Sequence, residues 1–244
     1  MKTAFSVNVN KFALVRNSRG ADTPNLASLC KQILNCGAKG ITVHPRPDQR
    51  HARYDDLPIL NELVRKYNHA EFNVEGYPNQ TFLDEVCSIK PHQVTLVPDE
   101  PGQLTSDHGW NCQKNAAFLK SIVDRLHLHG MRVSLFLDPD PLQVIHAAAT
   151  GADRIELYTE GYAHNYKTAK ETSTTDYAAT AKAAQDAGLG VNAGHDLSLE
   201  NLQYFLEQVP NILEVSIGHA FVCESWQFTI NKTVEKYLHI TQSN

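Results

Sequence analysis

The sequence predicts a single-domain α/β protein with the (β/α)8 architecture of a TIM barrel, and two observations carry this prediction. Eight short runs of apolar and β-branched residues recur along the chain, and a helix-like stretch follows each of them. At 244 residues, the chain is close to the roughly 250 residues that one such barrel usually takes. The strands are expected at Ala4–Asn10, Gly40–His44, Glu71–Glu75, Gln93–Val97, Arg132–Asp138, Asp153–Leu157, Leu189–Asn192 and Leu213–Ile217.

Amphipathic spacing predicts the helices that cover these strands. Apolar residues recur every three or four positions over residues 26–34, 57–67 and 199–209. The stretch from Tyr158 to Gly190 is too long for one loop and one helix, so we expect an additional helix after the sixth strand. Strands that are almost continuously apolar and covered by helices indicate a buried parallel sheet.

One domain over residues 1–244 is the simplest organisation, because no linker or change of composition divides the chain. The alternative is a doubly wound open sheet, which normally has a glycine-rich turn after its first strand. The corresponding segment, residues 8–11, contains no glycine, so the barrel is favoured.

The composition excludes several classes of function. The net charge is −5 and no stretch is strongly basic, which argues against nucleic acid as a partner but is compatible with a small phosphorylated molecule. No run approaches the ~20 apolar residues that span a membrane. Asn8, Asn10 and Lys11 interrupt the apolar N-terminal stretch, which argues against a signal peptide. The five cysteines are odd in number and lack metal-site spacing, which is typical of reduced thiols in a cytoplasmic protein.

Polar and ionisable residues stand at or just after the predicted strand ends. In a (β/α)8 barrel these ends converge on one face, and that face carries the functional site. The residues in these positions include Asn10, His44, Glu75, Thr105, Asp138, Glu156, His195 and His219.

A basic loop, residues 44–51, follows the second strand and predicts a phosphate site. It holds His44, Arg46, Arg50 and His51, and two prolines restrict its backbone. Arginine binds phosphate oxygens through a planar pair of N–H groups, and a restricted loop lowers the entropy cost of holding them in place. The alternative is a solvated charged turn that pairs with the aspartates at positions 55 and 56.

Glu75 ends the third predicted strand, where a buried carboxylate is costly unless it is paired or used. We interpret it as a general base whose pKa is raised by desolvation. The alternative is a structural partner for a neighbouring arginine.

Two glycine–histidine turns are expected after the last two strands, at residues 192–196 and 216–220. Glycine lets backbone N–H groups approach an anion, and a following helix N-terminus adds its positive end. The corresponding loops of this barrel are the usual phosphate site. His195 could add a proton-transfer group. The alternative is that these glycines only end the strands.

Together these segments resemble the pyridoxine 5′-phosphate synthase (PdxJ) family from about residue 5 to about residue 235. The resemblance implies a (β/α)8 barrel with additional helices that assembles as a homo-octamer built from dimers. It also implies condensation of 3-amino-2-oxopropyl phosphate (the amino-ketone phosphate) with 1-deoxy-D-xylulose 5-phosphate (the sugar phosphate). The products are pyridoxine 5′-phosphate, phosphate and water, without a metal or organic cofactor. The motifs on which the resemblance rests are residues 8–10, 16–20, 40–44, 46–51, 73–75, 96–98, 191–195 and 217–220.

The resemblance assigns roles to individual residues. The proton acceptors would be His44 and Glu75, and the proton donor would be His195, with Glu156 as a further carboxylate of the site. The sugar phosphate would be held by Arg46, His51 and Thr105. The amino-ketone phosphate would be held by Asn8, Gly218, His219 and Arg19, the last supplied by a neighbouring subunit.

Two positions differ from the commonest family pattern. Asn10 and Lys11 replace an aspartate–histidine pair after the first strand, and we expect Lys11 to bind substrate. Asp196 replaces a glycine, so it either places a negative charge near the phosphate or caps the following helix.

Three other functions fit some of the same residues. One is a metal-dependent phosphosugar epimerase with ligands at positions 44, 75, 156 and 195. Another is an aldolase that forms an imine on Lys11. The third is a phosphometabolite-binding protein that lacks catalysis.

Overall fold

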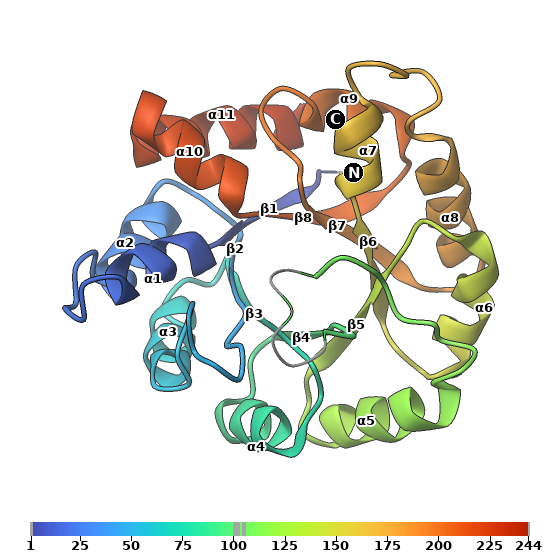
Figure 1. The fold of residues 1–244 in the computed structure, drawn as a ribbon, viewed down its shortest axis with the longest axis horizontal. Helices are drawn as coiled ribbons and strands as arrows, with labels where there is room; N and C mark the ends of the chain where they lie inside the picture. The colour runs from blue at the N-terminus through green and yellow to red at the C-terminus, as the bar shows by residue number, and fades with distance from the viewer. Residues whose placement is uncertain (1, 100–102, 104–105, 244) are drawn as a thin grey trace.

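Eight parallel strands close into a barrel in chain order, and helices surround it (Figure 1). The computed structural model describes residues 2–99, 103 and 106–243. The strands are β1 (Ala4–Asn8), β2 (Gly40–Val43), β3 (Glu71–Gly76), β4 (Gln93–Leu96), β5 (Arg132–Leu137), β6 (Arg154–Tyr158), β7 (Gly190–His195) and β8 (Ile212–Ile217). The helices in the described ranges are α1 (Asn10–Asn17), α2 (Leu26–Asn35), α3 (Asp56–Val64), α4 (Gln80–Ile89), α5 (Ala116–Leu128), α6 (Pro141–Ala149), α7 (Glu160–Asn165), α8 (Thr175–Asp186), α9 (Leu202–Gln208), α10 (His219–Phe228) and α11 (Ile230–Gln242).

The predicted (β/α)8 architecture is confirmed, and β1 pairs with β8 to close the sheet. Each predicted strand overlaps an observed one. The additional helix expected after the sixth strand is α7, which precedes α8. In the ranges that the structure describes, no helix is both long and apolar enough to cross a membrane.

Two predicted C-terminal strand ends are wrong by more than one residue. The first strand ends at Asn8, and Asn10, predicted to end it, is the first residue of α1. The side-chain oxygen of Asn8 accepts a hydrogen bond of 3.1 Å from the backbone N–H of Asn10, and this local bond turns the chain out of the strand. The seventh strand continues past Asn192 to His195. No amphipathic stripe marks α1, so the sequence does not predict this helix.

Side chains that point out of the barrel form the apolar core with the surrounding helices. Successive residues of a strand point to opposite faces, and Phe72 and Val74 of β3 are fully buried on the outer face. Phe5 of β1 stacks on Tyr237 of α11 with ring centroids 4.7 Å apart. Burying a large apolar side chain contributes roughly 1.5–3 kcal/mol, so this layer is the main source of stability.

The faces that point into the barrel are polar, so the expectation of almost continuously apolar strands is wrong. The hydroxyls of Ser6 and Thr42 lie 2.9 Å apart, and the Asn73 amide donates to the Thr42 hydroxyl at 3.4 Å. Thr95 in turn donates to the side-chain oxygen of Asn73 at 3.1 Å. Most barrels of this kind fill their interior with branched apolar residues. Here, the interior is filled instead by polar side chains that form hydrogen bonds between neighbouring strands.

The loop after β4 is fastened to the barrel at Gly109 and Trp110. The indole N–H of Trp110 donates to the backbone carbonyl of Leu96 at 2.9 Å, and its backbone N–H donates to the carbonyl of Phe136 at 2.8 Å. A Cβ atom at Gly109 would lie 2.2 Å from the backbone nitrogen of Asp138. Only glycine fits this contact without moving the backbone.

Replacing Gly109 with alanine should therefore destabilise the fold. We expect Gly109→Ala to lower the free energy of unfolding by about 1–3 kcal/mol, the usual cost of overpacking. Urea unfolding followed by circular dichroism would measure this change. Gly161→Ala in α7 is the matched control, because its added Cβ would only reach ordinary contact, 3.4 Å from the Tyr177 hydroxyl. Equal stability of the two variants would contradict the prediction.

Candidate active site

A cavity of about 500 Å³, which we call the central cavity, lies at the carboxyl ends of the strands, where the sequence predicts the site. It brings together twelve of the fourteen predicted site residues. These are Asn8, Asn10, Lys11, His44, Arg46, His51, Glu75, Glu156, His195, Asp196, Gly218 and His219.

Two predicted residues are not among them. Arg19 is exposed, two residues beyond the end of α1, and does not line the cavity. Thr105 lies outside the described residues. Six further residues line the cavity and are absent from the predicted set. They are Leu14, Arg50, Ser106, Tyr158, Glu160 and Ser216.

Sequence signals exist for some of these missed residues. Tyr158 is the last residue of β6, and Glu160 follows it closely, so a strict search of strand ends finds both. Ser216 lies inside the predicted turn before Gly218. Leu14 carries no signal, because it belongs to a helix that the sequence does not predict.

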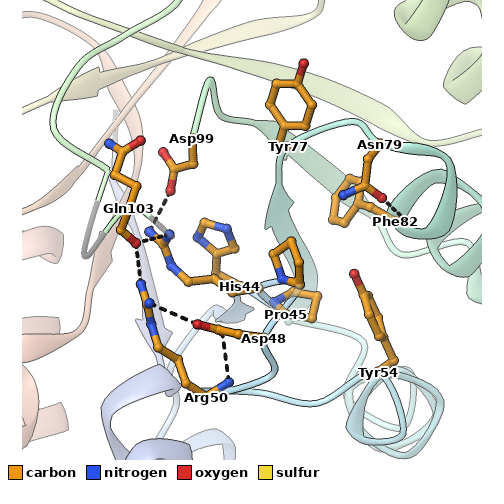
Figure 2. A pocket seen from close by; sticks show the side chains of 12 residues that line it. His44, Pro45, Asp48, Arg50, Tyr54, Tyr77, Asn79, Phe82, Asp99 and Gln103 are labelled. Carbon is orange, nitrogen blue, oxygen red and sulfur yellow. Dashed lines mark hydrogen bonds and ion pairs between the residues drawn. The ribbon is translucent and has the colours of Figure 1, made fainter. Parts of the chain in front are cut away.

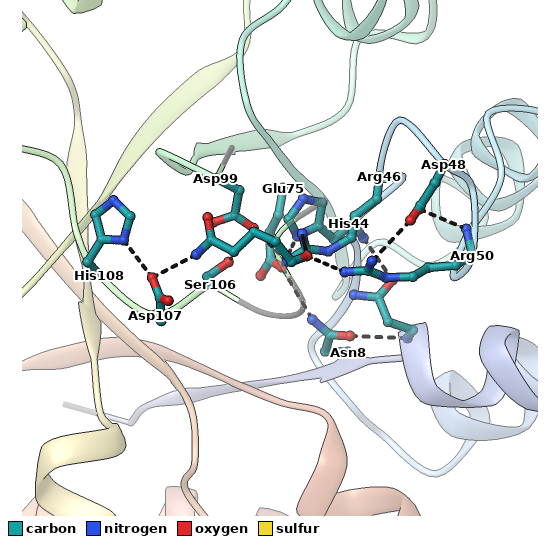
Figure 3. A network of polar contacts seen from close by, with 12 residues as sticks. Asn8, His44, Arg46, Asp48, Arg50, Glu75, Asp99, Ser106, Asp107 and His108 are labelled. Atoms are coloured by element: carbon teal, nitrogen blue, oxygen red, sulfur yellow. Dashed lines mark hydrogen bonds and ion pairs between the residues drawn. The ribbon is translucent and has the colours of Figure 1, made fainter. Parts of the chain in front are cut away.

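Glu75 and His44 form the centre of the site (Figure 3). The Asn8 amide donates to Glu75 Oε2 at 3.3 Å, and His44 Nδ1 lies 4.0 Å from the same oxygen. Burial raises the pKa of Glu75 well above its usual range, and Glu156 and Asp99 raise it further. Burial lowers the pKa of His44, an effect that Arg46 increases. Desolvation thus favours the neutral form of both groups, so their contact is not a charged ion pair.

Asn10 has a structural task in addition to its place in the cavity. Its side-chain oxygen accepts a 2.9 Å hydrogen bond from the backbone N–H of His44. This bond ties the start of the basic loop to the first turn of α1. The side chain of Asn10 therefore positions His44.

Glu156 projects from β6 into the lumen and continues its polar layer. The Thr95 hydroxyl, which donates to Asn73, also lies 3.4 Å from Glu156 Oε2 and shares its proton with that oxygen. Burial, and then the charge of Glu214, raise the pKa of Glu156 to about 8. A Cβ atom on Gly194 would lie 2.7 Å from Glu156 Oε1, so the glycine leaves room for this carboxylate.

His195 is held in an unusual backbone conformation. Its φ is +85°, in the left-handed region that costs energy for a residue other than glycine. The rings of Phe136 and Tyr158 pack against it in T-shaped contacts, with centroids 4.9 Å and 5.8 Å away. Its Nδ1 atom has no hydrogen-bond partner within the described ranges. Burial, with the nearby charges of Arg46 and Lys11, lowers the pKa of His195 to about 4.

The two glycine–histidine segments are therefore not alike, and the predicted turn at residues 192–196 is wrong. Residues Gly190–His195 form β7, and the left-handed residue there is the histidine. After β8 the prediction is better, since Gly218 directly precedes the ten-residue helix α10. The hydroxyl of Ser216, beside it in the cavity lining, is buried without a hydrogen-bond partner in the described part of the chain. A helix N-terminus with an adjacent free hydroxyl is suited to binding an anion.

The basic loop is anchored by acidic and polar partners that differ from the predicted ones. Arg46 Nη2 donates to Asp99 Oδ2 at 2.6 Å, and Arg46 Nη1 donates to the Gln103 carbonyl at 2.9 Å. Asp56, a predicted partner of this loop, instead pairs with Arg16 of α1 at 2.6 Å. The charged-turn alternative is thus wrong in its pairing, and sequence reasoning missed Asp99.

The loop also rests on α1. The Asn17 amide donates to the backbone carbonyls of Gln49, Arg50 and His51, the last at 2.7 Å. Burial and the charge of Lys11 lower the pKa of His51 to about 4. His51 Nδ1 is buried and has no hydrogen-bond partner among the described residues.

Asp196 is exposed and lines the central cavity together with Glu160. It does not cap the following helix, because the N-cap residue of α9 is Asn201. The capping alternative is therefore wrong, and the charge of Asp196 belongs to the cavity lining. Across the described residues, no three His, Cys, Asp or Glu side chains form a cluster that could hold a metal ion. The ligand set of the epimerase alternative is accordingly not assembled.

Known proteins resemble this chain over nearly its whole length. A family model described as "Pyridoxal phosphate biosynthesis protein PdxJ" matches residues 5–243. A pyridoxine 5′-phosphate synthase from Bacteroides thetaiotaomicron is 48% identical over 235 residues, covering 96% of this chain and 98% of that protein. A protein of the same name from Christiangramia forsetii is 48% identical over 238 residues, covering 98% and 99%.

More distant solved structures share the architecture. The tryptophan synthase A-subunit from Pyrococcus furiosus has a TM-score of 0.63 at 16% identity, with 98% of each chain covered. A thiamine phosphate pyrophosphorylase from the same organism has a TM-score of 0.60 at 13% identity, covering 99% of this chain and 96% of that one. At these identities the likeness shows the fold alone.

The raised pKa of Glu156 predicts how stability depends on pH. Folding raises this pKa from 4.5 to about 8, so the stability it contributes is complete below pH 4.5 and is lost as the pH rises through 8. Glu156→Gln cannot ionise, so its free energy of unfolding should fall less between pH 5 and 9 than that of the wild type. Urea unfolding across this range would test this. Glu160→Gln is the control, because Glu160 is an exposed carboxylate of the same cavity, and its free energy of unfolding should change with pH as in the wild type. The same pH dependence in Glu156→Gln and the wild type would refute the prediction.

Proposed function

This chain belongs to the PdxJ family of pyridoxal phosphate biosynthesis proteins, and we infer that it is a pyridoxine 5′-phosphate synthase of vitamin B6 biosynthesis. It would condense the amino-ketone phosphate with the sugar phosphate to give pyridoxine 5′-phosphate, phosphate and water. One observation carries this assignment beyond sequence similarity. Three acid–base groups at positions 44, 75 and 195 line one cavity with a basic loop and with the N-terminus of α10.

We propose two phosphate positions in this cavity. The basic loop, with Arg46 and His51, would hold the sugar phosphate together with Thr105, because guanidinium and imidazole N–H groups suit phosphate oxygens. The N-terminus of α10, with Gly218 and His219, would hold the amino-ketone phosphate. Asn8 and the neighbouring subunit's copy of Arg19 would complete this second position.

Lys11 and Asp196 are charged residues at positions where this chain differs from the commonest family pattern. Both line the cavity. Lys11 would attract either phosphate electrostatically without forming a covalent bond. Asp196 would face the cationic amine of the amino-ketone phosphate in place of a phosphate group.

The proton transfers fall to Glu75, His44 and His195. Closing the ring through an imine requires several proton transfers and the loss of water and phosphate, which suits several titratable groups better than one nucleophile. His44, neutral when buried, would accept a proton from the joined substrates, and Glu75 would do so once it has released its own proton. Glu156, with its pKa near 8, would serve as a neighbouring acid that exchanges a proton near neutral pH.

The lowered pKa of His195 means that it cannot act as a proton donor at the start of the reaction. With a pKa of about 4, the imidazole is neutral near pH 7 and must gain a proton before it can give one. A bound phosphate dianion beside it would raise this pKa. We therefore propose that His195 accepts a proton early in the reaction and donates it to a leaving group later.

Incubating the purified protein with both substrates and following pyridoxine 5′-phosphate by absorbance tests the proposed function. Turnover that persists after chelation excludes the epimerase alternative. A borohydride-stable adduct on Lys11 would instead favour the aldolase alternative. Substrate binding by calorimetry without turnover would identify a binding protein.

Replacing Glu75 should abolish most activity without harming the fold. Glu75→Gln keeps the shape but removes the base, so we expect kcat to fall by roughly 10²–10⁴. Stopped assays at saturating substrate would measure kcat. Glu62→Gln on the exposed face of α3 is the control, since its side chain is 78% exposed and pairs only at the surface with Lys66. Turnover near the wild-type level in Glu75→Gln would remove this residue from the mechanism.

We also propose that the enzyme works in the cytoplasm as a homo-octamer in which each subunit lends Arg19 to its neighbour. The exposure of Arg19 and its absence from the lining of its own central cavity support the shared site. Mixing Arg19→Ala with Glu75→Gln under subunit exchange should restore part of the activity, because some sites regain both wild-type groups. If Arg19 acts within its own subunit, every site keeps one defect and the mixture stays inactive. Mass spectrometry would verify that exchange occurred.

A further inference from the structure

Arg46 lines two cavities, and Asp99 lines only one of them. The central cavity includes Arg46 in its lining but not Asp99. A second cavity of about 350 Å³, which we call the side cavity, is lined by both, together with Tyr54, Tyr77 and Phe82 (Figure 2). Asp99 therefore bonds to the guanidinium group of Arg46 without lining the central cavity itself.

Asp99 holds Arg46 as part of a clamp formed by Asp99, Gln103 and Ser106 (Figures 2 and 3). Its Oδ2 atom accepts from Arg46 Nη2 at 2.6 Å and from the Ser106 hydroxyl at 2.8 Å. The carbonyl of Gln103 accepts from Arg46 Nη1 at 2.9 Å. The side chains of Arg46 and Asp99 are only 6% and 4% exposed. Charge-assisted bonds between buried groups fix the plane of the guanidinium.

The clamp leaves donors of Arg46 available. A guanidinium group carries five N–H donors, and the clamp bonds Nη1 and Nη2. The Nε atom is buried and has no hydrogen-bond partner among the described residues. A buried donor without a partner is rare in folded proteins, and an anion in the cavity would satisfy it.

We propose that Asp99 is a positioning residue for the reaction: it holds Arg46 so that the remaining N–H groups bind the phosphate of the sugar phosphate. Asp99 itself touches no substrate. The inference rests on the proposed function, since it assigns a residue to the same phosphate position. The opposite role, in which Asp99 competes with the phosphate for Arg46, conflicts with its absence from the central-cavity lining.

Asp99→Asn tests this role, because it keeps the shape of the clamp and removes its charge. A loosened guanidinium binds phosphate less well, so KM for the sugar phosphate should rise about tenfold. The KM for the amino-ketone phosphate should change by less than about twofold, so the rise is specific to the sugar phosphate. Asp99→Glu restores the carboxylate one methylene further out and should recover part of the affinity.

Asp84→Asn is the matched control. Asp84 of α4 also pairs with an arginine, Arg125, at 2.7 Å, but neither residue lines the central or the side cavity. Its side chain is 58% exposed, so its loss is screened by solvent and KM should stay at the wild-type value. If Asp99→Asn fails to fold, Ser106→Ala removes one clamp bond and should raise the same KM to a smaller extent.

Three outcomes would overturn the inference: an unchanged KM for the sugar phosphate, a lower one, or an equal rise for both substrates. A lower value would mean that Asp99 competes with the phosphate. Wild-type turnover separates this inference from the proposed function. A wild type that makes no pyridoxine 5′-phosphate refutes the function, whereas an active wild type with an unaffected Asp99→Asn refutes only the role of Asp99.

Discussion

Ionisable groups buried inside the barrel must be hydrogen-bonded or neutral, and the rest of the structure depends on this constraint. The apolar residues of the strands point outward and pack against helices, so the interior is free to carry polar side chains. A chain of bonds from Ser6 through Thr42 and Asn73 to Thr95 links some of those side chains and ends at Glu156. Two strand faces thus have separate tasks: the outer face stabilises the fold, and the inner face positions the acid–base groups.

The same desolvation that makes burial costly also prepares these groups for proton transfer. Burial raises the pKa of Glu75 and Glu156 and lowers the pKa of His44 and His195. The opposite shifts reverse the usual order of proton affinity, because Glu156, with a pKa of about 8, holds its proton more tightly than His195, with a pKa of about 4. The cationic loop beside them adds a second effect, because its charge further disfavours protonated histidine until an anion is bound.

The sequence predicts the barrel and most of the site because both follow from periodicity. Strand ends of a parallel barrel converge, so a polar residue at each end, such as His44 or Glu75, can be placed without knowing any contact. What could not be predicted depends on contacts between segments distant in sequence. The φ of +85° at His195 reflects packing by Phe136 and Tyr158, and the partner of Arg46 is an aspartate two strands further along the chain. The sequence does not predict the polar interior of the barrel, because residues such as Ser6, Thr42 and Thr95 stand singly among strong strand formers.

The close approach of Gly194 to Glu156 has a consequence for how this protein can evolve. An alanine at position 194 would meet the carboxylate at 2.7 Å, so selection on that position depends on the residue at position 156. The Glu156 carboxylate must move, which disturbs the hydrogen bond from Thr95, and the backbone carbonyl of Ser216 would lie only 3.1 Å from the added Cβ atom. The two positions on neighbouring strands should therefore covary across homologues, and a library that randomises residue 194 alone should return mainly glycine.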